Sequence, residues 1–266
     1  MSADFNACIA YVNLADTDDA VITASSSLPR TPVQSRLQNP HVARKWRGRL
    51  GTSEYIVIDL GSVVALDTVC LFGVSGVSPT FRVRLSTSDT SGAAGDVFDS
   101  GTLTGTPYFD SSYGAFIYLR SSASSGRYLR IDISESGVEY IEAGRVFVGD
   151  RVQVEVNFSS WSRAFVDQSR RTYGRGGQMF ADIEDSYRTL EVSFDALTED
   201  ERYAFVEYID RVHGEHADFL FVMDPTSDNL SRDSIWGFVD GGSAVSEPSI
   251  SVPPRFSKSY NIRERL

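Results

Sequence analysis

The feature that most constrains this fold is a series of short stretches in which apolar and polar residues alternate. Residues 81–85 alternate strictly and place Arg82 and Arg84 on the face opposite their apolar neighbours, and residues 129–133 follow the same pattern. A period of two puts successive side chains on opposite faces of a strand. Clusters of Ser, Gly, Thr and Asp, such as 86–95 and 121–126, separate these stretches and are typical of turns. The first 150 residues therefore predict a β-sandwich or jelly roll.

The second half of the chain has a different pattern. Alternating or continuous apolar stretches predict strands at 152–158, 190–194, 219–223 and 235–239, and the last twenty residues are expected to be extended. The polar stretch 159–177 predicts a hairpin or an extended loop, with Gly174, Gly176 and Gly177 as its flexible points.

One helix is expected in this half. Thr198 followed by Glu201 is a capping box, and Gly214 is the residue at which the helix should end. Four apolar residues at i, i+3, i+4 and i+7 form the stripe that we expect to be buried. These are Phe205, Tyr208, Ile209 and Val212.

Length and composition support a mainly β protein of two domains, 1–150 and 151–266. The chain has 266 residues, of which 41% are hydrophobic, enough for a core in each part. No apolar run approaches the roughly 20 residues that cross a bilayer, and the first residues lack the pattern of a secretory signal. We expect a protein without membrane insertion that folds in a cytoplasm.

Charge argues against a nucleic-acid partner, because the formal net charge is −11. Residues 21–53 are an exception, since they contain six basic residues and no acid. The six are Arg30, Arg36, Arg44, Lys45, Arg47 and Arg49. Almost all basic residues in the chain are arginines, which suits interfaces formed through charged contacts; a genome rich in GC explains this equally well.

The first half carries motifs of a known family. Trp46 precedes residues 55–61, which end in Asp-Leu-Gly; residues 126–131 read Gly-Arg-Tyr-Leu-Arg-Ile, and residues 142–149 look like the closing strand of that family. This half resembles the discoidin, or coagulation-factor C-domain, family of galactose-binding-like jelly rolls. The resemblance implies a jelly roll with a possible glycan as its ligand.

Residues 190–225 resemble a unit of phage tail proteins. A strand, a capped amphipathic helix and a strand ending at Pro225 are similar to the tail-tube-like unit, a β-sandwich or barrel with one helix, of tail-tube and distal-tail proteins of long-tailed bacteriophages. The resemblance implies a homo-oligomeric ring, a hexamer or trimer, in the distal tail or baseplate of a virion. Its partners would be the tail tube protein and hub or fibre proteins, assembled in the host cytoplasm. The alternative is a carbohydrate-binding module for glycan adhesion.

Two sets of residues are candidate contact sites. Arg44, Trp46 and Arg47 combine an aromatic ring with guanidinium groups, which suits a glycan or an acidic partner; Trp46 is alternatively a core residue. Residues of the expected hairpin are the candidate oligomer interface. They are Trp161, Arg163, Arg170, Arg171 and Arg175.

A neighbouring subunit could offer the acids of the expected helix to this hairpin, or both surfaces could simply be solvated. The acids are Glu199, Asp200, Glu201, Glu207 and Asp210.

Catalytic chemistry has little support in the sequence, and we expect a protein that is not an enzyme and has no metal or cofactor. His213 and His216 could bind a metal or cap the helix. Three acids, Asp16, Asp18 and Asp19, could hold calcium or be solvated.

The cysteines, Cys8 and Cys70, lie in apolar segments and are expected to be small buried hydrophobes.

Overall fold

The computed structural model describes residues 5–49, 51–76, 78–105, 114–247 and 253–266. The chain forms two compact units. One, which we call the jelly-roll unit, contains Cys8–Val152 and Val222–Ser234; the other, the arm unit, contains Met1–Ala7, Gln153–Phe221 and Ile235–Leu266. The chain passes from the jelly-roll unit to the arm unit at residues 152 and 153.

The jelly-roll unit is built almost wholly from strands. Its larger strands are β2 (Val21–Ala24), β4 (Ser53–Val74), β5 (Thr80–Ser86), β8 (Gly114–Ser134) and β10 (Arg145–Gly149). Shorter strands are β1 (Cys8–Ala10), β3 (Trp46–Arg47), β6 (Phe98–Asp99), β7 (Leu103–Thr104), β9 (Glu142–Ala143) and β11 (Val152–Gln153), the last ending just past the unit's boundary. Its helical turns are η2 (Leu14–Asp16), α1 (Val33–Leu37) and α3 (Leu230–Asp233).

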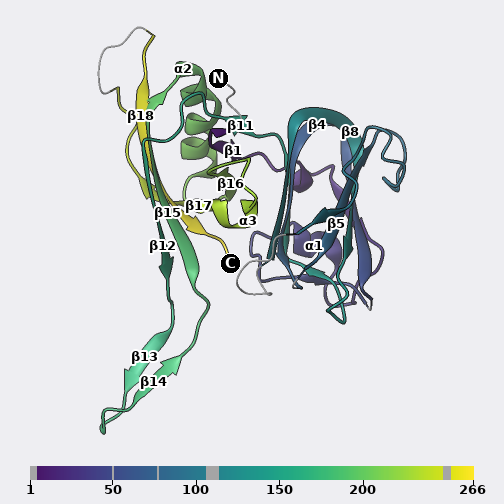
Figure 1. Ribbon diagram of the computed structural model, residues 1–266, viewed down its shortest axis with the longest axis horizontal. Helices are drawn as coiled ribbons and strands as arrows, with labels where there is room; N and C mark the ends of the chain where they lie inside the picture. The colour runs from purple at the N-terminus through teal and green to yellow at the C-terminus, as the bar shows by residue number, and fades with distance from the viewer. Residues whose placement is uncertain (1–4, 50, 77, 106–113, 248–252) are drawn as a thin grey trace. The chain divides into compact units, whose positions relative to one another are not determined.

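The main sheet of this unit has the order β10-β4-β8-β5-β6, with β2 also paired to β4 and β7 to β5, all antiparallel. The register between β4 and β8 breaks between Asp59 and Val64, where Gly61 has a φ of 76°, a conformation that favours glycine. Before the break β4 lies beside β2, and after it beside β10. The long strands therefore bend and serve two layers around one core (Figure 1).

Alternation in the sequence accounts for that core. Val83, Leu85, Leu129 and Ile131 are all buried in it, together with residues from both halves of β4. The polar residues between them face outwards, as the strict alternation of 81–85 predicts. The expectation of a mainly β chain is confirmed by the described strands.

The arm unit has one sheet, one helix and a two-stranded ribbon among its described residues. Its strands are β12 (Ser160–Val166), β13 (Arg170–Tyr173), β14 (Met179–Asp182), β15 (Tyr187–Leu197), β16 (Phe219–Val222), β17 (Ser234–Gly242) and β18 (Phe256–Glu264). The order of these strands in the sheet is β16-β17-β18-β15-β12, and the separate ribbon is β13-β14. The strands predicted at 190–194, 219–223 and 235–239 are confirmed, and the extended C-terminal segment is confirmed at β18; residues 248–252 of that segment lie outside the described residues.

The predicted strand at 152–158 is wrong beyond β11. Side chains replace a strand's backbone bonding here: Asn6 Nδ2 donates to the carbonyls of residues 154 and 155, and Asn157 Oδ1 accepts from the Ala7 N–H. The Glu155 N–H donates to the carboxylate of Glu201 at 2.6 Å. These groups satisfy the backbone without a ladder, so residues 154–159 form an irregular connection.

The predicted capping box is present. Thr198 Oγ1 accepts from the Glu201 N–H at 3.1 Å, and the Glu201 side chain accepts from the Thr198 N–H at 2.7 Å. The helix begins as α2 (Glu199–Glu201) and continues through two π-helical stretches, η3 (Arg202–Val206) and η4 (Ile209–His213), to Gly214.

The predicted apolar stripe is partly wrong because of this wider winding. Residues at a spacing of four, Phe205, Ile209 and His213, are buried, whereas Val212 is exposed. In a π-helix the hydrogen bond runs from residue i to residue i−5, as from the Gly214 N–H to the Ile209 carbonyl. The wider turn rotates Val212 away from the core and brings His213 into it.

The expected hairpin at 159–177 is confirmed and is longer than predicted. β12 and β15 pair from Ser160↔Ser193 to Val166↔Tyr187, and β13 and β14 pair from Arg170↔Asp182 to Tyr173↔Met179. Figure 1 shows the β13–β14 ribbon continuing beyond the end of the sheet to which β12 and β15 belong. We call residues 160–186 the arm.

Candidate interaction sites

The first set of predicted contact residues lies at β3, which pairs with β9. Trp46 is fully buried, and its indole N–H donates to the Ser26 carbonyl at 3.1 Å. Its ring is therefore part of the core and does not form part of the surface. Arg47 is half-buried, pairs with Glu142 and stacks on the Tyr140 ring with 3.9 Å between guanidinium carbon and ring centroid. Of the three, only Arg44 is exposed.

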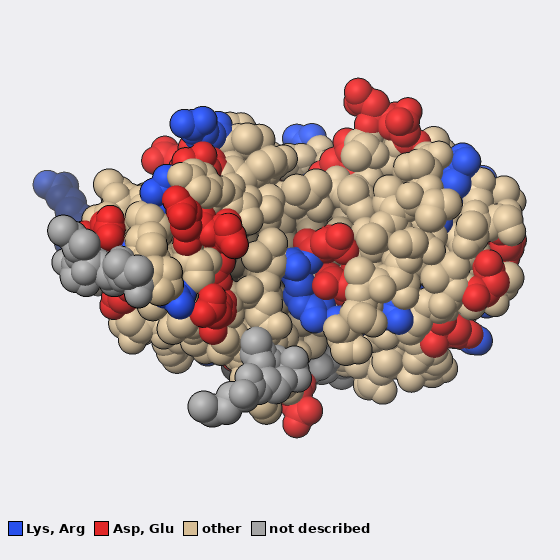
Figure 2. Space-filling model, turned by 90° about the horizontal axis from the view of Figure 1, so that it is seen from above, with Lys and Arg blue, Asp and Glu red and all other residues tan. Residues whose placement is uncertain are grey.

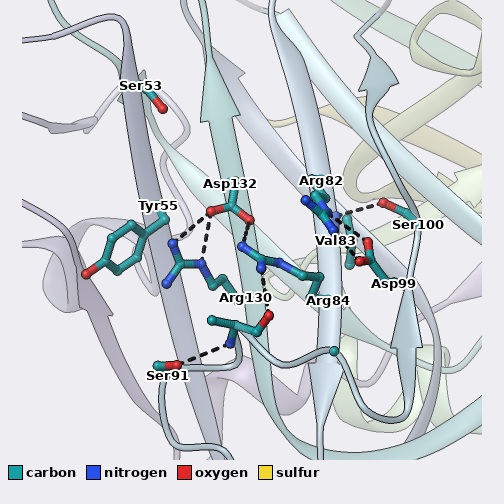
Figure 3. A network of polar contacts seen from close by, with 12 residues as sticks. Ser53, Tyr55, Arg82, Val83, Arg84, Ser91, Asp99, Ser100, Arg130 and Asp132 are labelled. Atoms are coloured by element: carbon teal, nitrogen blue, oxygen red, sulfur yellow. Dashed lines mark hydrogen bonds and ion pairs between the residues drawn. The ribbon is translucent and has the colours of Figure 1, made fainter.

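Charged residues on the outer face of β5, β6 and β8 form a network of ion pairs with one another. Arg82 makes a two-pronged contact with Asp99 at 2.9 and 2.5 Å. Asp132 lies between two guanidiniums, accepting from Arg84 at 2.5 Å and from Arg130 at 2.9 Å (Figure 3).

Two more contacts extend this network. The guanidinium carbon of Arg130 stands 3.6 Å from the centroid of the Tyr55 ring. Arg84 Nη1 donates to the Ala93 carbonyl at 2.7 Å, which fastens the loop 86–95 to the sheet. Two carboxylates, Asp99 and Asp132, are shared among three arginines, and these contacts hold the sheet and the loop together. On the face drawn in Figure 2, acidic and basic side chains are likewise interspersed.

The second set of predicted contact residues lies on the arm, and all five are exposed. Arg170 is 3.8 Å from Glu184, and Arg171 is 3.2 Å from Asp167. Arg163 lies over Trp161 at 6.0 Å. Arg175 occupies the turn, where the Gly174 N–H donates to the Gln178 carbonyl.

The predicted pairing of arm arginines with helix acids is weakened by the fold. Glu201 is buried in the capping box, and Asp210 accepts hydrogen bonds from the buried Lys258 at 2.9 and 2.7 Å. The arm also balances its own charge, with four arginines and four acids between residues 160 and 186. A long-range attraction between a basic arm and an acidic helix is therefore small.

Large apolar side chains are the arm's main surface feature, and the sequence reasoning named only Trp161 among them. Six of them have exposed fractions between 49% and 86%: Trp161, Phe165, Tyr173, Met179, Phe180 and Ile183. The cross-strand register puts Phe180 opposite Thr172 on one face and Met179 opposite Tyr173 on the other. Phe165, Met179, Ala181 and Ile183 line a shallow groove on this second face. The signal available in the sequence was the spacing of two between the apolar residues 179, 181 and 183, which puts them on one face of a strand.

The calcium and metal candidates are placed as follows. Asp16 forms an ion pair with the buried guanidinium of Arg145, whose Nη1 also donates to the Leu37 carbonyl at 3.2 Å. Asp18 is exposed. His213 is buried near the Tyr208 and Phe219 rings, whereas His216 is exposed.

Metal-binding geometry is missing from the part of the chain that the structure describes, where no group of three or more His, Cys, Asp or Glu side chains could hold an ion. Within the same residues no helix is long and apolar enough to cross a membrane.

Both cysteines are free and buried, which confirms their expected role. Burial raises the pKa of the Cys8 thiol to about 12, with the nearby Asp67 adding to the effect and Arg151 opposing it. Burial also raises the pKa of Cys70 well above its usual value. A thiol that stays protonated is a poor nucleophile and metal ligand.

A cavity of about 150 Å³ lies in the jelly-roll unit beside β8. Phe116 and Tyr118 line it together with hydroxyl-bearing Thr104 and Ser227. Tyr118 is stacked between Phe116 and Phe98, with centroids 6.5 and 5.7 Å away. Aromatic side chains beside hydroxyl groups suit a small ligand that is itself rich in hydroxyls. The sequence reasoning did not find this cavity, because its lining comes from segments over 100 residues apart.

Comparisons with known proteins give structural likeness only. The sequence matches no protein-family model and no curated protein. Solved structures that resemble about half of the chain include a family 32 carbohydrate-binding module from Clostridium perfringens in complex with galactose (9% identity, TM-score 0.40, 54% of this chain and 99% of that one). A chitosan-binding module from Paenibacillus sp. IK-5 is another (20% identity, TM-score 0.38, 52% and 98%).

A third similar structure is a further family 32 module from C. perfringens (14% identity, TM-score 0.37, 52% and 98%). These proteins are carbohydrate-binding modules with the discoidin-like, galactose-binding-like jelly-roll fold, which is the fold expected from the motifs in the first half. Identities of 20% and below, with TM-scores under 0.5, say nothing about what this chain binds.

Proposed function

We propose that this protein is a structural subunit that assembles with copies of itself through the arm. The observation that carries the proposal is the exposure of six large apolar side chains on a two-stranded ribbon. Exposed apolar clusters of this kind mark interaction sites. An isolated hairpin is also only marginally stable in water, so an arm with both faces in solvent gains stability from a partner.

The occupant of the groove is a second copy of this chain. Asp167, Arg171 and Glu184 border the apolar groove, and the arm as a whole carries four charges of each sign. A surface with both signs in equal number can complement itself, whereas the rest of the chain, at −11 overall, favours separation. Symmetric association of identical chains is the usual route to such an assembly.

Apolar contact, and not the arginine contacts expected from the sequence, would hold the copies together. Burial of apolar surface is insensitive to moderate salt, whereas attraction between exposed charges is screened. The assembly should therefore survive high salt.

Light scattering on the full chain tests this proposal. The wild-type protein should have the mass of a discrete oligomer, in low salt and in 1 M NaCl alike. Met179→Ser/Ile183→Ser removes two side chains from the groove face and should yield monomers. Phe180→Ser is the matched control, since it changes an equally exposed apolar residue on the opposite face, and it should retain the oligomer. A wild-type monomer at every concentration would contradict self-assembly.

The assembly is further proposed to be a ring in the distal tail or baseplate of a long-tailed phage, in contact with the tail tube and hub or fibre proteins. The resemblance of the sequence of residues 190–225 to tail proteins supports this, and so does the long hairpin, because ring-forming tail proteins reach the neighbouring subunit with an extended hairpin or loop. Electron microscopy of the oligomer should reveal closed rings with a central opening. Isolated dimers or open filaments would contradict a ring.

Glycan binding by the jelly-roll unit is a second candidate function. The cavity beside Tyr118 favours it, because aromatic rings and hydroxyl groups meet there in a space that suits one sugar ring. Calorimetric titration with galactose and other monosaccharides tests it. Tyr118→Ala should abolish any binding, and Tyr128→Ala, outside the cavity lining, should preserve it.

A further inference from the structure

Four arginines of the acid-free segment 21–53 lie on the surface of the jelly-roll unit. They are Arg30, Arg36, Arg44 and Arg49, which are exposed or half-exposed. None of the ion pairs found among the described residues includes them. Other arginines of this unit, such as Arg127 and Arg145, are paired with acids. We call these four residues the arginine surface.

Hydrogen bonds bring part of this surface together. Arg36 Nη2 donates to the Arg30 carbonyl at 3.0 Å, so the two residues are adjacent although six positions apart. Arg44 lies in the loop that enters β3, and its N–H donates to the His41 carbonyl at 3.1 Å.

Strand β3 joins the remaining arginine to the same surface. Arg49 Nε donates to the Ser27 carbonyl at 3.2 Å, and the Leu28 N–H donates to the Arg47 carbonyl at 3.0 Å. The segment that carries Arg30 is thus fastened along the segment that carries Arg49.

The acids nearest to this surface leave it positive. Glu142 is paired with Arg47, and Glu54 is buried, where it accepts hydrogen bonds from Ser25 and Ser26. Glu139 is exposed, and its backbone carbonyl accepts a hydrogen bond from the Gly51 N–H at 3.2 Å. One exposed acid beside Arg30, Arg36 and Arg49, which form no ion pair among the described residues, leaves an excess of positive charge on a chain that is acidic overall.

Exposed apolar groups are sparse on this surface as far as the structure describes it. Among the described residues of the segment 21–53, Val21 is the only large hydrophobic side chain that is exposed. Protein interfaces depend on buried aromatic and aliphatic anchors, which this surface does not offer. A hydrated anionic polymer needs no such anchor.

We propose that the arginine surface binds a polysaccharide that carries carboxylate groups. A guanidinium presents two parallel N–H donors that match both oxygens of a carboxylate. Several guanidiniums on one surface can therefore bind the repeated carboxylates of an acidic polymer. Single-stranded nucleic acid needs exposed rings on which bases stack, but the Tyr140 ring is covered by Arg47.

Retention on immobilised polygalacturonate tests this proposal, with dextran as the neutral polymer. The wild-type protein should bind polygalacturonate and not dextran, and added NaCl should weaken the binding. Arg30→Gln/Arg49→Gln should raise the Kd roughly tenfold through the loss of two charged contacts.

Arg211→Gln/Arg263→Gln in the arm unit is the matched control, because it removes the same charge from another surface, and its Kd should stay unchanged. Melting temperature and oligomer mass verify that both variants fold and assemble. An unchanged Kd for Arg30→Gln/Arg49→Gln would overturn the proposal. Equally tight binding of single-stranded DNA would overturn the assignment to a polysaccharide.

Discussion

The guanidinium of Arg127 makes two hydrogen bonds to the carboxylate of Asp59, at 2.7 and 3.0 Å, between strands β8 and β4. Asp59 also accepts from the Gly61 N–H at 2.9 Å, so one carboxylate holds both the neighbouring strand and the bend in β4. This contact joins the Asp-Leu-Gly and Gly-Arg-Tyr motifs that indicate the jelly roll in the sequence. The two motifs are far apart in the chain, and the contact between Arg127 and Asp59 brings them together in the fold.

Asp59→Asn should reduce stability at neutral pH and make stability less dependent on pH. Hydrogen bonds from Arg127 hold the pKa of Asp59 below its usual value, so its contribution is present above the unfolded-state pKa, about 3.9, and is lost as pH falls further. Urea unfolding at pH 7 and pH 3 should show a gap between wild type and variant that narrows in acid. Asp18→Asn, at an exposed acid, is the control; a gap of the same size at both pH values would disprove this role.

Trp46→Ala should destabilise the jelly-roll unit by about 3–5 kcal/mol, the usual range for truncation of a buried aromatic residue. Trp46→Phe should cost less, because it keeps most of the packing and loses the hydrogen bond to Ser26. Urea unfolding of both variants measures the difference. If Trp46→Ala kept full stability and lost only a ligand, the assignment of this ring to the core would be wrong.

Arg145→Leu should destabilise the protein by about 3 kcal/mol, at the low end for a broken buried pair because Asp16 is partly exposed. The same pair predicts that millimolar calcium leaves the melting temperature of the wild type unchanged, since Asp16 is already neutralised by a guanidinium. Thermal unfolding with and without calcium measures both effects. A calcium-dependent rise in the wild type would show that Asp16 prefers the metal.

Trypsin should cleave the arm after Arg175, which lies between two glycines in an exposed turn. Assembly through the groove should slow this cleavage, so concentrated wild-type protein should resist longer than the Met179→Ser/Ile183→Ser variant. Mass spectrometry of timed digests follows the fragments. Equal rates in both proteins would mean that the arm stays free in the assembly.

Local patterns were sufficient for much of the fold. The capping box at Thr198 and Glu201 depends on groups three residues apart, so the sequence alone predicts it. The alternation of residues 81–85 and 129–133 likewise predicts which side chains are buried. The stripe containing Val212 failed because the sequence gives no sign of π winding. The strand at 152–158 failed because side chains distant in the chain, such as Asn6, occupy its backbone groups.

By itself, then, the sequence determined the mainly β class, the jelly roll of the first half, the hairpin and the capped helix, because periodicity and caps act between near neighbours. Only the tertiary structure decided which predicted contact residues reach the surface. Trp46 is buried by strands from elsewhere in the chain, and the arm's apolar face exists because two strands bring Phe165 and Ile183 to one side. Burial and pairing depend on residues that are distant in sequence, which no local pattern records.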